Sequence, residues 1–183
     1  MLLAGGRSLR LGTDKALLVV DGERLVDRAA RVLSACCAHV VLASGARPLP
    51  GLGLEIIADL ELHGGPLGAI VPALETASTQ LVAVLAVDHL QPSADVFRAL
   101  ADAWSGEAAV VPLADGRRQV LHAVYATAAA PALRAAWERG ERSITRALGD
   151  LDVRELSGLD ASFARDLDQT RSDGSDDEWS ALQ

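Results

Sequence analysis

The stretch LAGGRSLRLGTDKA, from Leu3 to Ala16, joins the apolar start of the chain to a turn that mixes glycine with cationic side chains. Gly5 and Gly6 have no Cβ atom, so the backbone there can bend tightly and bring its N–H groups against a phosphate chain. Arg10 and Lys15 place positive charge around that backbone. The pattern predicts a phosphate-binding turn at the end of a strand.

Neither of two familiar nucleotide motifs describes this turn. It lacks the closing Gly-Lys-Ser/Thr of a P-loop, and its glycines are not spaced as in a dinucleotide-binding turn. An ordinary solvated loop face is the alternative for Arg10 and Lys15 taken alone. Their position within a glycine-rich loop favours phosphate binding.

Composition and charge limit the class of protein. The chain has 183 residues, half of them hydrophobic but only 3% aromatic, so a single domain with a core of Ala, Val and Leu is expected. A net charge of −8 argues against a general nucleic-acid binder, which needs clustered cations. No apolar run approaches about 18 residues and no signal-peptide pattern begins the chain. We therefore expect a cytoplasmic protein without nucleic-acid or membrane partners.

Strand-like apolar runs alternate with helical patterns along the chain. This alternation is typical of an α/β fold, in which helices cover a mostly parallel sheet. We expect helices at 25–36, 66–77, 93–104, 129–139, 143–148 and 175–183, and strands at 1–4, 39–44, 54–58, 81–87, 108–112, 119–126 and 153–156.

Asp88 follows the continuous apolar run of residues 81–87, a pattern typical of a strand buried on both faces. Such a strand delivers Asp88 to the carboxyl edge of the sheet, where ligands bind in open α/β folds. A carboxylate there can hold Mg²⁺, which binds substrate phosphates through one or two protein carboxylates. The alternative is a cap on the turn into the helix that Ser93 begins. The phosphate-binding turn in the same chain favours the metal.

The opening stretch resembles the signature of the MobA-like nucleotidyltransferases, the family of molybdenum cofactor guanylyltransferase. Three later segments match that family in the same order, namely HGGPLG at 63–68, the strand at 119–125 and DLDQT at 166–170. The resemblance covers almost the whole chain. It implies a three-layer, Rossmann-like nucleotidyltransferase fold with a mixed, mostly parallel central sheet.

The resemblance also implies how one domain over residues 1–183 is organised. Its nucleotide-binding half spans about 1–90, its acceptor-binding half about 91–170, and a short helix at 175–183 ends it. Relatives have several more residues before the Leu-Ala-Gly-Gly turn, so either the natural start lies upstream or the first strand is trimmed.

The implied reaction is transfer of GMP from GTP to the terminal phosphate of the molybdenum–molybdopterin cofactor, with Mg²⁺ as the metal and pyrophosphate as the leaving group. A phosphate monoester is already anionic near neutral pH, so positioning and charge neutralisation matter more than a general base. The predicted catalytic residues are Arg10, Lys15 and Asp88. The family also implies transient contact with proteins that supply the cofactor or mature molybdoenzymes.

The resemblance assigns Asp59 to the guanine base. A carboxylate can accept from guanine N1–H and its 2-amino group together, whereas cytosine offers no matching donor pair. A solvent-facing Asp after a strand is the alternative. The full set of predicted nucleotide-binding residues is Leu3, Ala4, Gly5, Gly6, Lys15, Asp59, Gly65, Pro66, Leu67, Gly68 and Asp88.

Weaker matches suggest four further residues. Asp168 is a second metal ligand by resemblance, with an ordinary solvated charge run near the acidic tail as the alternative. His122, Arg142 and Ser143 are assigned to the acceptor side. For His122, and for His63 at the start of the glycine segment, a structural histidine is the alternative.

Other functions remain open at this point. The same site suits CMP transfer to the same cofactor, or nucleotidyl transfer to another small phosphorylated acceptor. A catalytically silent nucleotide-binding protein of the same fold is the alternative from another class, and the presence of Asp88 argues against it.

Overall fold

The computed structural model describes residues 1–5, 14–45, 49 and 51–166. Its central sheet contains the strands β1 (Leu2–Leu3), β4 (Val41–Ala43), β5 (Glu55–Ile56), β6 (Leu81–Ala86), β7 (Ala109–Ala114), β8 (Arg117–Arg118), β9 (His122–Ala126) and β10 (Val153–Leu156).

The strand order is β10-β7-β9-β6-β1-β4-β5, with β8 paired to β7. The pairings that involve β8 or β9 are antiparallel. The others in this sheet are parallel. The expected mixed, mostly parallel sheet is therefore confirmed.

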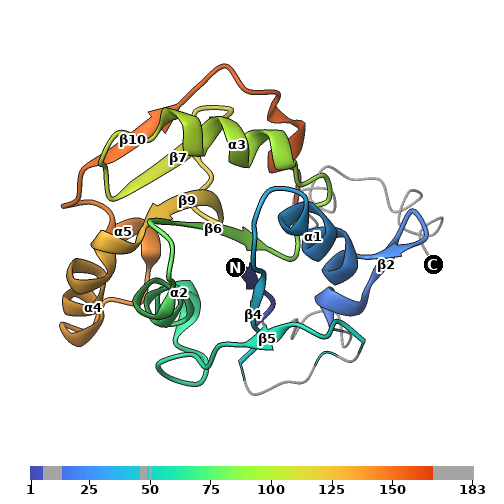
Figure 1. The fold of residues 1–183 in the computed structure, drawn as a ribbon, viewed down its shortest axis with the longest axis horizontal. Helices are drawn as coiled ribbons and strands as arrows, with labels where there is room; N and C mark the ends of the chain where they lie inside the picture. The colour runs from blue at the N-terminus through green and yellow to red at the C-terminus, as the bar shows by residue number, and fades with distance from the viewer. Residues whose placement is uncertain (6–13, 46–48, 50, 167–183) are drawn as a thin grey trace.

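Helices cover both faces of this sheet. Figure 1 shows α1 (Leu25–Ser34) and α3 (Ala94–Ala103) on one side, and α2 (Gly65–Thr76), α4 (Ala130–Glu138) and α5 (Ile144–Ala147) on the other. Leu2 packs into the core on the α1 side and Leu3 into the core on the α2 side, because successive side chains of a strand point to opposite faces. The three layers expected from the sequence are present.

Local signals explain where the helices begin. Ser93 Oγ accepts from the backbone N–H of Val96 at 3.4 Å and caps α3. Ser143 caps α5 in the same way, and its Oγ accepts from Arg146 N at 3.4 Å. Pro66 lies in the first turn of α2, where a missing N–H costs little. These starts agree with the sequence-based expectation to within one or two residues.

The structure contains a hairpin that the alternation of strands and helices did not predict. Its strands are β2 (Val19–Val20) and β3 (Glu23–Arg24), which pair antiparallel. They are joined by Asp21 and Gly22, whose φ angles of 53° and 78° suit a tight two-residue turn. The 3₁₀ helix η1 (Lys15–Leu17) precedes this hairpin. The expected C-terminal helix at 175–183 lies outside the described residues.

The sheet topology fixes where a ligand can bind. β1 lies between β4 and β6, and the three strands run parallel. Their carboxyl ends therefore meet at one edge, where a crevice forms in folds of this kind. The antiparallel β9 begins at the same edge, since His122 is paired with Leu85 near the end of β6. Among the described residues, no helix has both the length and the apolar character that crossing a membrane requires.

Candidate active site

A cavity of about 240 Å³ lies at this carboxyl edge. It is enclosed by the ends of β1, β4 and β6, by η1 and by the first turn of α2. The structure brings together here many of the predicted nucleotide-binding residues: Leu3, Ala4, Gly5, Lys15, Asp59, Gly65, Pro66 and Asp88. Gly6, Arg10 and Asp168 lie outside the described residues.

The other residues that line the cavity are not among the predicted nucleotide-binding residues. Most are small or apolar residues at strand ends or on the cavity side of a helix. Ala43 ends β4, and Ala4 directly follows β1. A position at the end of a predicted strand is the sequence signal that could have identified Ala43. The remaining lining residues are Asp14, Ala16, His63, Ala69, Ala86, Val87 and Leu121.

Lys15 and Asp88 converge on one point of the cavity. Lys15 begins η1, and Asp14 caps that helix because its Oδ1 accepts from Ala16 N at 3.0 Å. Lys15 Nζ lies 3.8 Å from Asp88 Oδ2, and the two side chains are 19% and 33% exposed. An ammonium that can hold phosphate and a carboxylate that can hold a cation are therefore adjacent and reachable from the cavity.

Asp59 also lines the cavity. A Cβ built on Gly5 would lie 3.8 Å from Asp59 Oδ2, so the turn after β1 and this carboxylate face each other across a short gap. Burial raises the pKa of Asp59. Its Oδ1 is buried, and no donor within the described part of the chain reaches it. A ligand that brings hydrogen-bond donors would satisfy this oxygen.

Leu67 and Gly68, predicted to bind nucleotide, lie away from the cavity, and their role toward nucleotide stays a prediction. Leu67 is fully buried in the core between α2 and the sheet. A Cβ on Gly68 would lie 2.8 Å from the indole of Trp137, and one on Gly64 would lie only 2.3 Å from it. Neither Leu67 nor Gly68 lines the cavity. Because Gly64 and Gly68 have no Cβ atom, this segment leaves space for the Trp137 ring.

Arg142 and Ser143 also lie away from the cavity. The Arg142 guanidinium stacks on Trp137, 3.7 Å from the ring centroid, and its Nη2 lies 3.3 Å from Glu61 Oε2. Ser143 caps α5. Both residues thus have structural contacts, and their role toward an acceptor stays a prediction.

The prediction that His122 touches the acceptor is wrong. Its ring is fully buried on the α3 side of the sheet, stacked on Phe97 at 4.4 Å and edge-on to Phe163 at 4.9 Å. Burial, and secondarily the neighbouring His89, lowers the pKa of His122 to about 3. Strand alternation places its neighbour Leu121 at the cavity instead. The buried, ring-stacked position is the one expected of a structural histidine, although neither ring nitrogen has a hydrogen-bond partner among the described residues.

Magnesium is compatible with this set of donors. Within the described ranges, no three His, Cys, Asp or Glu side chains are grouped so as to hold a metal ion. Mg²⁺ does not require such a cage, because it keeps waters and takes substrate phosphates with one or two carboxylates. Asp88, on the cavity wall, would supply one carboxylate, and the nucleotide would supply further oxygens.

A family model described as "MobA-like NTP transferase domain" matches residues 1–153. The chain is 36% identical over 126 residues to a "Probable molybdenum cofactor guanylyltransferase" of Pelotomaculum thermopropionicum, covering 68% of this chain and 62% of that relative. It is 33% identical over 151 residues to a protein of the same name in Chloroflexus aggregans, covering 79% of this chain and 73% of the relative.

A solved structure has the same fold. It is described as molybdopterin-guanine dinucleotide biosynthesis protein A from Archaeoglobus fulgidus, and it superimposes with a TM-score of 0.69 at 25% sequence identity. The match covers 85% of this chain and 81% of that one. The two chains therefore share one arrangement of strands and helices.

Proposed function

Because the chain belongs to the MobA-like NTP transferase domain family, whose model matches residues 1–153, we propose that it transfers GMP from GTP to the molybdenum–molybdopterin cofactor and releases pyrophosphate. Membership confirms the resemblance drawn from the opening stretch and makes the protein a nucleotidyltransferase. The names of its relatives in Pelotomaculum and Chloroflexus support guanylyl transfer to this cofactor.

One observation carries the proposal, namely the approach of Lys15 Nζ to within 3.8 Å of Asp88 Oδ2 beside the turn after β1. A triphosphate needs cationic donors at its phosphates and a carboxylate that can hold its metal. Both groups lie at the same point of the cavity, Asp88 just after β6 and Lys15 at the start of η1. A silent nucleotide-binding protein would bind through the same pair, so turnover is the measurement that separates the two functions.

The proposed reaction is an in-line displacement at the α-phosphorus of GTP. An oxygen of the acceptor phosphate forms the new P–O bond, while the bond between the α-phosphorus and the bridging α–β oxygen breaks and pyrophosphate leaves. The acceptor phosphate is already anionic, so no protein base has to take a proton. Lys15 and the backbone after β1 would hold the phosphates, and this positioning with charge stabilisation would supply most of the catalysis.

We propose that Asp88 binds the Mg²⁺ ion that accompanies the nucleotide. When bound, Mg²⁺ would neutralise charge on the triphosphate and on the departing pyrophosphate. Asp88 would be its main protein ligand, and Asp168 is proposed as a second. The other residues act on the nucleotide directly.

Asp59 is proposed to select guanine. Asp59 lines the cavity and its Oδ1 has no donor among the described residues, and the two oxygens of a carboxylate there would match guanine N1–H and the 2-amino group. Cytosine cannot offer the same two donors, so GTP is preferred to CTP. We further propose that the protein acts in the cytoplasm and makes transient contact with proteins that supply the cofactor or mature molybdoenzymes.

The test is turnover of the purified protein with each of the four nucleoside triphosphates, Mg²⁺ and molybdenum–molybdopterin cofactor. We expect guanine dinucleotide cofactor and pyrophosphate with GTP. Faster turnover with CTP would assign the protein to cytidylyl transfer. Nucleotide binding without pyrophosphate release from any of the four would identify a silent binding protein.

A further inference from the structure

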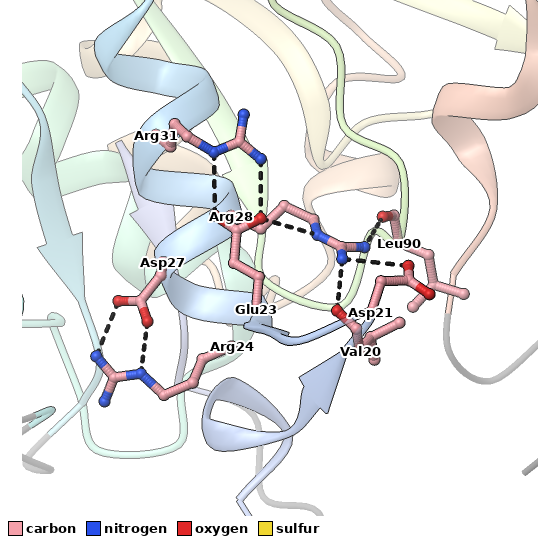
Figure 2. Close-up of polar contacts among 8 residues, drawn as sticks. All are labelled: Val20, Asp21, Glu23, Arg24, Asp27, Arg28, Arg31 and Leu90. Atoms are coloured by element: carbon pink, nitrogen blue, oxygen red, sulfur yellow. Dashed lines mark hydrogen bonds and ion pairs between the residues drawn. The ribbon is translucent and has the colours of Figure 1, made fainter. Parts of the chain in front are cut away.

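The guanidinium of Arg28 lies where two loops of the candidate site meet. Arg28 is on α1, and its side chain is only 13% exposed. Its Nη1 donates to the carbonyl oxygen of Leu90 at 2.7 Å, and its Nη2 donates to that of Val20 at 2.6 Å (Figure 2). Val20 follows Lys15 by five residues and Leu90 follows Asp88 by two. One side chain thus joins the two segments that carry the proposed catalytic pair.

Carboxylates complete the surroundings of this guanidinium. Glu23 Oε2 lies 3.5 Å from Arg28 Nε, and Asp21 Oδ2 lies 3.3 Å from Nη2. A charge that is so little exposed is tolerated only when it is paired and hydrogen-bonded. The planar fork of Arg can reach acceptors on separate segments at once, whereas a Lys ammonium acts from a single point. The site therefore suits Arg specifically.

Backbone hydrogen bonds also hold both loops close to their contacts with Arg28. Leu90 N donates to the carbonyl oxygen of Arg165 at 2.8 Å, so Leu90 is held through its N–H as well as through the carbonyl oxygen that Arg28 binds. On the other loop, Leu18 N donates to Lys15 O at 3.2 Å, and Leu18 O accepts from Leu25 N at 2.9 Å. The segment from Lys15 to the hairpin is therefore anchored to α1 by its backbone and by Arg28.

We propose that Arg28 is a positioning residue, which sets the separation of Lys15 and Asp88 by tying both loops to α1. It lines no part of the cavity and is not expected to touch substrate. The proposal rests on the proposed function insofar as Lys15 and Asp88 do the chemistry. A misplacement of about 1 Å between groups that act together can cost about a hundredfold in rate.

Arg31 provides a matched control on the same helix. It pairs with the same Glu23, its Nε donating at 3.0 Å and its Nη2 at 2.9 Å. Its side chain is 64% exposed, and in Figure 2 it lies on the far side of Glu23 from the two loop carbonyls. Loss of Arg31 removes a charge and an ion pair from α1 but leaves the tether between the loops.

The experiment compares Arg28→Gln, Arg28→Lys and Arg31→Gln with the parent, at a temperature at which circular dichroism shows all four folded. We expect Arg28→Gln to lower kcat by about ten- to a hundredfold with little change in the KM for GTP, because the tether acts on alignment. The kcat of Arg28→Lys should lie between those of Arg28→Gln and the parent, and the kcat of Arg31→Gln should stay within about twofold of the parent.

Amide hydrogen exchange supplies a readout that needs no activity. Residues 15–20 and 88–90 should exchange faster in Arg28→Gln and keep parental rates in Arg31→Gln. Equal effects of the two glutamine variants, or a lower melting temperature of Arg28→Gln with parental kcat and parental exchange in both loops, would overturn the proposal. If the parent itself shows no nucleotidyl transfer, the proposed function fails, while the exchange rates still decide whether Arg28 ties the loops together.

Discussion

Replacing Asp59 with Asn changes a single atom and tests base recognition and burial together. The carboxylate lines the cavity, burial raises its pKa, and no donor in the described part of the chain satisfies its Oδ1. The same substitution should therefore weaken recognition of guanine and stabilise the protein when no nucleotide is bound. Two effects of opposite sign from one variant are difficult to obtain by accident.

The loss in specificity follows from the hydrogen bonds. Asn keeps one acceptor oxygen but turns an amide donor toward the donors of guanine. Losing one hydrogen bond to a charged group costs about 1.5 to 3 kcal/mol, so the ratio of kcat/KM for GTP to that for CTP should fall about 10- to 150-fold. Because the comparison is a ratio, a general loss of active protein cancels out.

The gain in stability follows from the sign of the pKa shift. The folded pKa of Asp59 is raised, so ionisation of this group opposes folding. Its favourable contribution is fully present below the unfolded pKa, near about 4, and is lost as the pH rises through the folded pKa. Asn does not ionise. Nucleotide-free Asp59→Asn should therefore melt at a higher temperature than the parent near neutral pH, with the difference shrinking in acid.

The assay combines initial rates on GTP and CTP with thermal unfolding between about pH 4 and pH 8. Glu55→Gln is the control, since Glu55 is exposed on β5 four residues earlier and does not line the cavity. An unchanged GTP-to-CTP ratio with raised stability would make Asp59 a structural residue. A lower melting temperature at neutral pH would refute the argument from burial.

Three further experiments test other parts of the site. Lys15→Ala should lower turnover about a hundredfold or more, about 3 kcal/mol, with no loss of fold by circular dichroism; near-parental turnover would remove Lys15 from the mechanism. Asp88→Asn should abolish activity at ordinary Mg²⁺ while Asp168→Asn is milder, and a Mg²⁺ titration in which Asp168→Asn suffers more would reverse this ranking. Gly64→Ala places a Cβ 2.3 Å from Trp137 and should lower the melting temperature and weaken GTP binding. Trp137→Leu in the same chain should restore part of both losses, and simple additivity would count against the contact.

The outline of the fold was readable from the sequence because local patterns and sheet topology agree. The apolar run before Asp88 and the glycine turn after β1 each predict a strand end. Parallel strands bring such ends to one edge, so Gly5 and Asp88 are expected to line the same cavity. The approach of Lys15 to Asp88 at 3.8 Å also depends on η1, which the sequence analysis did not predict.

What the sequence analysis missed divides into two kinds. The hairpin of β2 and β3 was readable, because Asp21-Gly22 is a strong turn signal, and Asp115-Gly116 joins β7 to β8 with φ angles of 50° and 72° in the same way. The packing of Trp137 against Gly64 and Gly68 was not readable, because the ring and the glycines are about 70 residues apart and only the docking of α4 on α2 brings them together. Resemblance alone could not separate Gly65, which lines the cavity, from Gly68, which admits a side chain.

The distribution of charge explains how an acidic protein can act on anionic substrates. The net charge is −8, and several arginines are neutralised locally by carboxylates, as in the pairs Arg24 with Asp27 at 2.6 Å and Arg146 with Glu141 at 2.8 Å. Lys15 is the only lysine of the sequence, and it lies in the cavity, where Asp88 balances it. A free triphosphate would therefore meet an acidic protein with little compensating charge at this pair, whereas a nucleotide that arrives with Mg²⁺ brings the missing cation to Asp88 and leaves Lys15 for the phosphates. We therefore predict that the metal–nucleotide complex is the substrate, and that GTP without Mg²⁺ binds more weakly than MgGTP in a direct binding measurement.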